Sequence, residues 1–397
     1  MMRIALLAPL PPEQTGIADY AAHLKQALEA KGVEVITPLA GCGNEPRDAE
    51  ARIAAFDWQG IDLAHGELGG GRLAEFHALR TLRQLRPELP LSATVHDPER
   101  LVWRRAQLPW PLSLVQGMPS PLPQMATVMA DPLCLSEERK LAQSIDRLVT
   151  LTQTGAGYLR RRMRLPAEQV RVIAHGNQRI AEVPLPPTEP LRLLYFGFIY
   201  RGKGIEDLLD ALALLLRRQP SLRGQLRLTL AGGSEPETAF APGASYLDEL
   251  RRRIRIEGLE AVIEWDLDVP AAAIPALIQR HHVMVLPYRE SKKLRLLGSM
   301  RGTSGALSWA VACGRGVITS DARSFAEEVA SGNGAMYPQG RADALAEQLA
   351  RLLAEPGLAA QWAERARLIA AERAWDITAE RFVRHFETLR EVMPHVA

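Results

Sequence analysis

Two cations lie in a glycine-rich loop between a predicted strand and a predicted helix, an arrangement suited to binding phosphate. The apolar run 193–198 predicts a buried strand, and the loop after it contains Arg201 and Lys203. The loop glycines are Gly197, Gly202 and Gly204. Glycines let the backbone approach a ligand closely, and the free amides at a helix start favour an anion. We therefore predict that Arg201 and Lys203 hold a phosphate or diphosphate.

The elements around this loop alternate regularly between strand and helix. Strands are predicted at 191–198, 225–231, 261–265, 282–287 and 316–320, and helices at 205–219, 245–257, 270–280, 304–313, 324–331 and 341–354. Such alternation predicts an α/β fold with a doubly wound parallel sheet. Gly233 and Glu290 follow two of the strands and are expected at the carboxyl edge of the sheet, where ligands bind in such folds.

The first half of the chain begins with a unit of the same kind. A strand is predicted over 3–9, a loop ends at Gly16, and a helix begins near Ile17. Two nucleotide-type folds facing one cleft would produce this repetition. The segment 181–190 contains four prolines and is the predicted linker. The predicted domains are therefore 1–185 and 186–374, with a helix over 375–397 closing the chain.

Length and charge leave room for two domains and exclude some classes of protein. The chain has 397 residues and a net charge of +2, which excludes nucleic-acid binding driven by overall charge. Basic runs occur at 158–164, 250–255 and 291–295. They are interpreted either as solvated helix faces or as contacts with an anionic membrane or a phosphate-bearing acceptor. The Pro-rich segment 108–123 is either a loop tucked against the core or a lip that touches a lipid or glycan.

Cysteine spacing and local motifs indicate a reduced, metal-free protein. Cys42, Cys134 and Cys313 form no CxxC pair, which favours a cytoplasmic location. The chain enters a strand directly without a signal-like segment, and no run of 18 apolar residues occurs. The Asp266-Leu267-Asp268 motif is interpreted as an acidic loop, and His281-His282 lacks a third ligand at useful spacing. We expect no metal and no cofactor.

Several segments, in order, resemble one family over nearly the whole chain. They are APLPPEQTGIADYAAHLKQAL at 8–28, YFGFIYRGKGIEDLLDAL at 195–212, FAEEVASGNGAMYPQGRADALAEQLARLL at 325–353, and Trp375-Asp376-Ile377 before the last helix. The chain resembles glycosyltransferase family 4, the retaining, nucleotide-sugar-dependent enzymes of bacterial surface polysaccharide assembly. The resemblance implies the GT-B fold: two Rossmann-like domains facing a cleft, with a C-terminal helix that crosses back to the first domain.

The resemblance also assigns roles to individual residues. Arg201 and Lys203 match the pair that neutralises the leaving diphosphate, and fixed cations stabilise such charge as it develops. His96, in the motif TVHDP, matches an active-site histidine near the transferred sugar. Gly16 matches the loop glycine that lets the donor phosphate and the acceptor approach the backbone.

One departure from the family pattern concerns the donor sugar. The family carries two glutamates eight positions apart, and Arg301 and Trp309 stand in their places. Neither side chain accepts hydroxyl hydrogen bonds as a carboxylate does. Thr303, Ser304 and Gly305 remain and are expected to offer backbone amides to a phosphate. Glu290 is a candidate for the missing sugar contacts.

These observations lead to one functional hypothesis and two alternatives. The hypothesis is a retaining hexosyltransferase that moves a hexose, with GDP-mannose or a UDP-hexose as donor, to a glycan or polyprenyl-linked acceptor in bacterial polysaccharide biosynthesis. It would work in the cytoplasm, with peripheral contact to the anionic inner face of the membrane. The alternatives are a non-catalytic nucleotide-sugar or glycan-binding partner of an assembly complex, and a GT-B nucleotide-sugar epimerase.

Overall fold

The computed structural model describes the chain in two compact units, each treated by itself. The described residues are 1–13, 15–103, 108–119, 121–233, 246–290, 297–299 and 302–392. The first unit comprises Met1–Gly176, Lys292–Thr303 and Arg373–Ala397, and the second comprises Asn177–Ser291 and Ser304–Glu372. Arg301 and the basic run 291–295, both singled out in the sequence, lie outside the described residues.

The first unit is built on a parallel sheet. Among the described residues this sheet has six strands in the order β2-β1-β3-β4-β5-β6. The strands are β1 (Arg3–Leu7), β2 (Glu34–Ile36), β3 (Leu63–Leu68), β4 (Leu91–Val95), β5 (Arg147–Thr150) and β6 (Val170–Val172). The helices are α1 (Gly16–Ala30), α2 (Pro46–Ala55), α3 (Leu73–Leu85), η1 (Leu112–Val115), α4 (Leu122–Ser144), α5 (Gln153–Met163), η2 (Ala167–Gln169) and α13 (Trp375–Val392). Strands β3 and β4 are buried along their whole length, as expected of a parallel sheet covered on both faces.

The second unit repeats this plan with a second parallel sheet. Its six described strands run in the order β12-β11-β10-β7-β8-β9. They are β7 (Leu191–Phe196), β8 (Leu226–Gly232), β9 (Ile263–Leu267), β10 (Val283–Leu286), β11 (Gly316–Ser320) and β12 (Gly334–Tyr337). The helices are α6 (Ile205–Arg218), η3 (Pro220–Gly224), α7 (Tyr246–Ile256), η4 (Ala271–Ala273), α8 (Ile274–Gln279), α9 (Gly305–Ala312), α10 (Phe325–Val329), α11 (Ala342–Ala354) and α12 (Leu358–Glu372). The predicted pair of doubly wound α/β folds is confirmed.

Helix α6 is held to the second sheet by its apolar stripe. Leu208, Leu209 and Leu212 are fully buried, and each such side chain contributes about 1.5–3 kcal/mol relative to an exposed one. The helix starts directly after Gly204, which adopts the left-handed conformation (φ +67°). Burial of this stripe therefore fixes the position of the glycine loop that precedes the helix.

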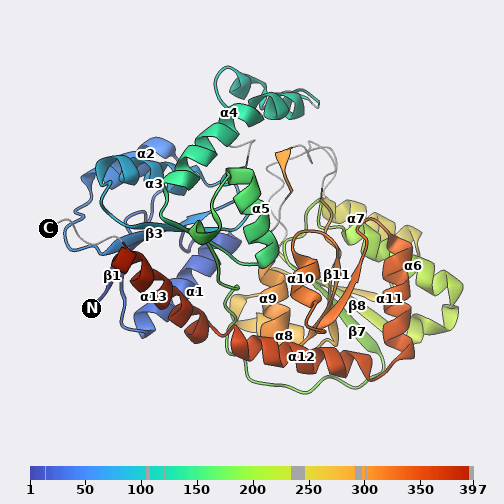
Figure 1. Cartoon of the computed structure of the whole chain (residues 1–397). Helices are drawn as coiled ribbons and strands as arrows, with labels where there is room; N and C mark the ends of the chain where they lie inside the picture. Colours follow the sequence, from blue (N-terminus) through green and yellow to red (C-terminus); the bar gives the residue numbers. More distant parts are fainter. Residues whose placement is uncertain are drawn as a thin grey trace. The chain divides into compact units, whose positions relative to one another are not determined.

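The last helix belongs to the first unit, although the chain reaches it from the second. Helix α13 packs against α1, with Phe382 and Phe386 fully buried (Figure 1). At its start the Trp375 ring occupies the space beside Gly176, where an added Cβ would lie 2.3 Å from the indole. Ser92 on β4 and the Nε2 of His385 lie 2.8 Å apart in a hydrogen bond. The predicted return of the C-terminal helix is confirmed.

The buried Arg315 holds the predicted linker, residues 181–190, against the rest of the second unit. Arg315 is 1% exposed and donates to the backbone carbonyls of Val183 and Pro184 in that segment, at 3.2 and 3.1 Å. It also donates to the carbonyls of Gln279 and His281, at 2.7 and 2.8 Å. Burial lowers the pKa of this guanidinium to about 10, so it stays charged at neutral pH. The planar guanidinium thus joins the linker 181–190 to the end of α8 and to the residues that lead into β10.

Arg315→Lys is expected to lower the free energy of unfolding of the protein by about 2–3 kcal/mol, because an ammonium cannot reach all these carbonyls. Urea denaturation followed by circular dichroism measures the change. Arg223→Lys is the control, since Arg223 is exposed and donates to the Gly258 carbonyl at 2.7 Å. An Arg315→Lys protein as stable as the control would contradict this role.

Candidate functional site

The glycine loop of the second unit lies where the strand order reverses. Strands β7 and β10 are neighbours, and their connections leave in opposite directions, which is where ligands bind in doubly wound sheets. An added Cβ at Gly204 would lie 1.8 Å from the Pro287 carbonyl oxygen, so only glycine allows the loops after β7 and β10 to meet. The backbone amide of Arg289 also donates to the Gly202 carbonyl at 3.0 Å. The two loops therefore form one rigid platform.

Lys203 lies in this platform with its ammonium between aromatic rings. The residue is 9% exposed, and its Nζ lies 4.0 Å from the ring centroid of Tyr288 and 5.0 Å from that of Tyr200. Within the described part of the chain, no carboxylate forms an ion pair with Lys203. Cation–π contacts compensate only part of the cost of removing an ammonium from water. The platform thus carries a positive charge that an anionic ligand would neutralise.

The pKa of the Tyr288 hydroxyl reflects the positive charge of Lys203 and of a second cation, Arg323. Burial raises the pKa of the Tyr288 hydroxyl, but the charges of Lys203 and Arg323 outweigh burial and hold this pKa below its ordinary value. The guanidinium carbon of Arg323 lies 5.3 Å from the Tyr288 ring centroid. The Tyr288 hydroxyl and the Ser304 hydroxyl are hydrogen-bonded at 3.1 Å. The start of α9, which includes Ser304, is therefore joined to the Lys203 platform.

The predicted partner cation, Arg201, is directed elsewhere. Its guanidinium pairs with Glu249 on α7 and lies 5.2 Å from the Tyr246 ring centroid. The hydrogen bond from Arg201 lowers the pKa of Glu249, and the Arg201 side chain is 53% exposed. Arg201 would have to exchange Glu249 for a phosphate in order to bind one. Its proposed role with a diphosphate remains a prediction.

The predicted donor-binding residues surround the platform in different ways. One Glu290 carboxylate oxygen accepts from the backbone amide of Arg323 at 3.1 Å, so Glu290 holds the turn after β11. Gly233 packs beside Phe198, whose ring would lie 3.4 Å from an added Cβ. Gly305 begins α9, and Ser304 at the N-cap position makes no capping bond with its side chain. The first amides of α9 are therefore left without a side-chain cap, and their predicted contact with phosphate remains a prediction.

His96 in the first unit is held by a buried carboxylate. His96 follows β4, and its Nε2 lies 2.7 Å from a carboxylate oxygen of Glu67 on β3, which is fully buried. His65 approaches the other oxygen at 3.4 Å and bonds Thr94 at 2.9 Å. Burial raises the pKa of Glu67, but its bonds to His65 and His96 outweigh burial, and the pKa lies below its ordinary value. Because a carboxylate only accepts, His96 carries a proton on Nε2.

Aromatic rings pack around His96. The Tyr20 ring on α1 meets the rings of His96, His175 and Trp375 edge-on, at centroid distances of 4.9, 5.0 and 5.2 Å. Burial lowers the pKa of His175 to about 4, so this imidazole is neutral at pH 7. Burial and the nearby Glu67 charge raise the pKa of Tyr20 well above its ordinary value. At neutral pH the Tyr20 hydroxyl and the His175 imidazole are therefore uncharged, whereas the Glu67 carboxylate is ionised.

Glycines bring three segments of the first unit to His96. An added Cβ at Gly69 would lie 2.9 Å from the His96 Cβ and 3.2 Å from Ile17, the residue after Gly16. An added Cβ at Gly302 would lie 2.0 Å from the His96 carbonyl oxygen. Gly16, His96 and the segment ending at Thr303 therefore converge within this unit, and their roles remain predictions. Nothing crowds Gly16 itself, where an added Cβ would meet no atom within 4 Å.

Glu67, Tyr288 and Arg323 are absent from the residues predicted from the sequence. Glu67 carried a usable signal, because an acidic residue in an apolar strand is buried and needs a partner. Tyr288 lies two residues after the end of β10, at the carboxyl edge of the sheet. Arg323 carried no signal, since a single arginine in a loop gives no indication of what it faces.

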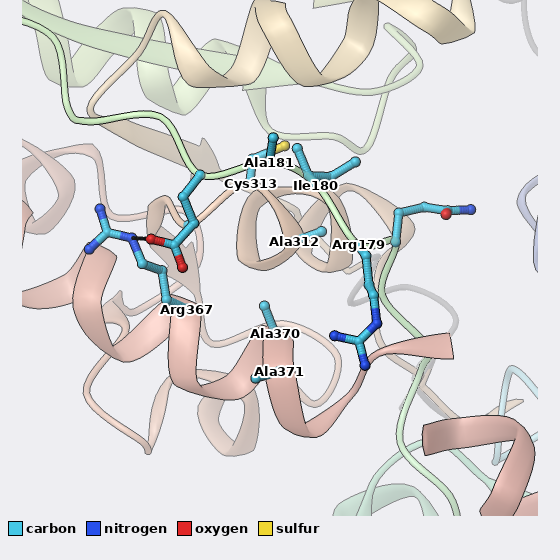
Figure 2. Close-up of a pocket in the computed structure, with 11 residues that line it drawn as sticks. Arg179, Ile180, Ala181, Ala312, Cys313, Arg367, Ala370 and Ala371 are labelled. Carbon is cyan, nitrogen blue, oxygen red and sulfur yellow. Dashed lines mark ion pairs between the residues drawn. The ribbon is translucent and has the colours of Figure 1, made fainter. Parts of the chain in front are cut away.

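A small pocket of the second unit lies away from these residues. Its cavity of about 140 Å³ is walled by the segment 178–182, the end of α9 and helix α12 (Figure 2). Arg367 pairs with Glu182 at its mouth, at 3.6 Å. Burial raises the pKa of the Cys313 thiol to about 12, so the thiol is not a nucleophile at neutral pH. The volume is below that of a typical small-molecule site.

Two further features were searched in the described ranges. No helix there is both long and apolar enough to cross a membrane. No group of three or more His, Cys, Asp or Glu side chains there is arranged to hold a metal ion.

Comparisons with known proteins agree with this fold. Residues 177–369 match the family of Glycosyl transferases group 1. The D-inositol 3-phosphate glycosyltransferase of Nocardiopsis dassonvillei is 28% identical over 290 residues, which are 68% of this chain and 64% of the relative. The chain thus spans just under two thirds of that relative's length. The enzyme of the same name from Kineococcus radiotolerans is 26% identical and is covered over 94% of its length, against 96% of this chain.

Solved structures extend the similarity of fold to the whole chain. Sucrose-phosphate synthase from Thermosynechococcus elongatus has a TM-score of 0.73 at 19% identity, covering 99% of this chain and all of that one. The Anabaena protein HepE in complex with UDP-glucose has a TM-score of 0.66 at 16% identity, covering 98% and 100%. The likeness to these structures shows that the chain has the GT-B fold. Residues 177–369 match the group 1 glycosyl transferases, which agrees with the glycosyltransferase resemblance noted in the sequence.

The Glu67 carboxylate makes a prediction about stability and pH. Its pKa is lower in the folded than in the unfolded chain, so its stabilisation is present above the ordinary carboxyl range and is lost as the pH falls through the folded pKa. Glu67→Gln is expected to lower the free energy of unfolding by about 1–3 kcal/mol at pH 7. The difference from the native protein should shrink below about pH 4.

Urea denaturation at pH 7, 4 and 3 measures this difference. Glu34→Gln is the control, because the pair between Glu34 and Arg3 is about 42% exposed and is expected to contribute under about 1 kcal/mol. A Glu67→Gln deficit that stays constant from pH 7 down to pH 3 would show that the carboxylate is not ionised in the folded protein.

Proposed function

We propose that the protein is a retaining hexosyltransferase. It transfers a hexose, with mannose as one candidate, from a nucleotide-sugar to a glycan or lipid-linked acceptor in bacterial polysaccharide biosynthesis. One observation carries this proposal: Lys203 holds a nearly buried ammonium, without a carboxylate partner among the described residues, where the strand order reverses. A nucleoside diphosphate gains negative charge as it leaves, and a fixed cation in such surroundings stabilises that charge.

The groups around Lys203 support a diphosphate as ligand. Ser304 offers a hydroxyl bonded to Tyr288, and the uncapped start of α9 offers backbone amides, beginning at Gly305. Gly233 and Glu290 belong to loops at the same edge of the sheet and are proposed to border the donor. The HepE complex shows that a protein of this fold binds UDP-glucose. We assign no metal or cofactor to the reaction.

The proposed chemistry needs little from the protein beyond placement and charge. The acceptor hydroxyl attacks the anomeric carbon from the face that the diphosphate leaves, and the leaving phosphate takes the proton. Lys203 stabilises the departing diphosphate. Because the Nε2 proton of His96 is committed to Glu67, a neutral His96 presents Nδ1 as an acceptor for a sugar hydroxyl. Glu67 thus acts through His96, as a positioning residue.

A non-catalytic binding partner is the second candidate, and Trp309 favours it. This residue stands where the family resemblance places a glutamate, and its ring is partly buried against the core of the second unit. An indole offers one donor and no acceptor to the sugar or ribose hydroxyls. An epimerase is a third alternative, which would act on a nucleotide-sugar without an acceptor. Release of nucleoside diphosphate from a panel of GDP-, UDP- and ADP-sugars separates the transferase from the other two.

Lys203→Ala is expected to lower kcat for sugar transfer by about 10²–10³-fold, as loss of one transition-state contact does in other enzymes. Lys203→Arg should retain an intermediate rate, because it keeps the charge but not the fit between the rings. Arg201→Ala should have a smaller effect, since Arg201 is half-exposed and paired with Glu249. Coupled detection of released nucleoside diphosphate gives these rates.

Arg217→Ala is the matched control, because Arg217 makes an exposed pair with Glu257 in the same unit. Its kcat should equal that of the native protein. A Lys203→Ala protein with unchanged donor affinity and turnover would overturn the proposed site. Tight binding of a nucleotide-sugar with no turnover on any acceptor would favour the binding partner instead.

A further inference from the structure

A helical arm of the first unit exposes large apolar side chains. The arm consists of η1 and the first part of α4, residues 108–131, and extends away from the sheet of that unit (Figure 1). Trp110 is 80% exposed, Leu114 is 68% exposed and Met129 is 66% exposed. These values exclude the interpretation of 108–123 as a loop tucked against the core, because its largest apolar residues face outward.

The exposed residues of α4 form one stripe. Leu122, Met125, Met129 and Leu133 are spaced three and four residues apart, so they share one face of the helix, and all are exposed. The residues of α4 that are buried in this stretch are smaller: Pro123, Ala126, Thr127 and Ala130. Helix α4 contacts η1. The arm is thus a small helical hairpin with large apolar residues on its outer face.

Beyond Leu133 the same helix has the opposite character. Cys134, Leu135 and Leu141 are buried, the last two within the core of the first unit. The apolar stripe is therefore confined to the projecting half of the helix. The anchored half holds the arm in place, so exposure of the stripe follows from the packing of α4.

The arm and the residues at its base differ in their content of charged side chains. Asp131 is the one charged residue in the sequence 108–131, and it pairs with Arg162 on α5 at 3.1 Å. Arg139 lies beside this pair and donates to the Arg162 carbonyl at 2.9 Å. Arg160, Arg161 and Arg164 continue the basic run of α5, which contacts α4. An uncharged apolar tip thus stands on an arginine-rich base.

We propose that this arm attaches the protein to an anionic lipid bilayer. The stripe and Trp110 enter the boundary between headgroups and acyl chains, while the arginines at the base bind anionic headgroups. A bilayer with anionic lipid supplies an apolar layer beneath a negative surface, which complements this order of groups. A protein partner would need an apolar groove bordered by acidic residues at the same spacing. The inference concerns attachment and stands whether or not the transfer chemistry above is correct.

Flotation of the full chain with vesicles tests the proposal. The vesicles contain either phosphatidylcholine alone or phosphatidylcholine with about 30% phosphatidylglycerol, each at low and physiological salt. The native protein should bind the anionic vesicles at least tenfold more tightly, and more tightly at low salt. Met125→Gln/Met129→Gln/Leu133→Gln should lose at least tenfold in binding. Arg160→Gln/Arg161→Gln should weaken binding to anionic vesicles and reduce its salt dependence.

Matched controls separate this stripe from general surface hydrophobicity. Ile256→Gln/Leu368→Gln removes exposed apolar residues of the second unit and should leave vesicle binding unchanged. Thermal unfolding should be the same for all variants, because the substituted side chains are exposed. Nucleotide-sugar hydrolysis in solution should be unchanged in the triple variant, which separates attachment from the proposed chemistry.

Two results would overturn the proposal. One is the absence of binding to anionic vesicles at low salt. The other is a dimer of the native protein that the triple variant abolishes, measured by sedimentation velocity without lipid, which would assign the stripe to self-association.

Discussion

The proposed site depends on a buried ammonium that has aromatic neighbours but, in the described chain, no carboxylate partner. Lys203 is held between Tyr200 and Tyr288 by two loops that only a glycine at 204 allows to meet. Burying a cation without a counter-ion is costly, so folding of the second unit leaves a site that gains free energy from an anion. The apolar stripe of α6 and the core beneath β7 and β10 supply the stability that offsets this cost.

The two units hold different kinds of chemical groups in place. The second unit presents cations and amide donors at the reversal of its strand order, which suits a phosphate-bearing donor. In the first unit, Glu67 fixes the proton of His96 on Nε2, and Gly69 and Gly302 bring neighbouring segments against that histidine. Both arrangements rest on parallel sheets that are buried on both faces, because such sheets place successive loops at one edge.

Sequence predicted the parallel sheets and their loops well, because fully buried strands produce apolar runs with glycines at their ends. It did not predict α4, since Pro123 and Pro132 are ordinarily helix breakers; a proline is tolerated in the first turn, as at Pro123. The bond between Glu67 and His96 joins residues 29 apart, and only the pairing of β3 with β4 brings them together. Arg201 and Lys203 are two residues apart, yet their side chains diverge because Glu249, distant in sequence, pairs with Arg201.

The proposal that Lys203 binds a diphosphate is tested most directly by calorimetric titration of the native protein. UDP and GDP would be compared with uridine and guanosine, which carry the same bases without phosphate. We expect one of the diphosphates to bind at least 100-fold more tightly than its nucleoside, a difference of about 2.7 kcal/mol or more. Equal affinities for nucleoside and diphosphate would contradict it.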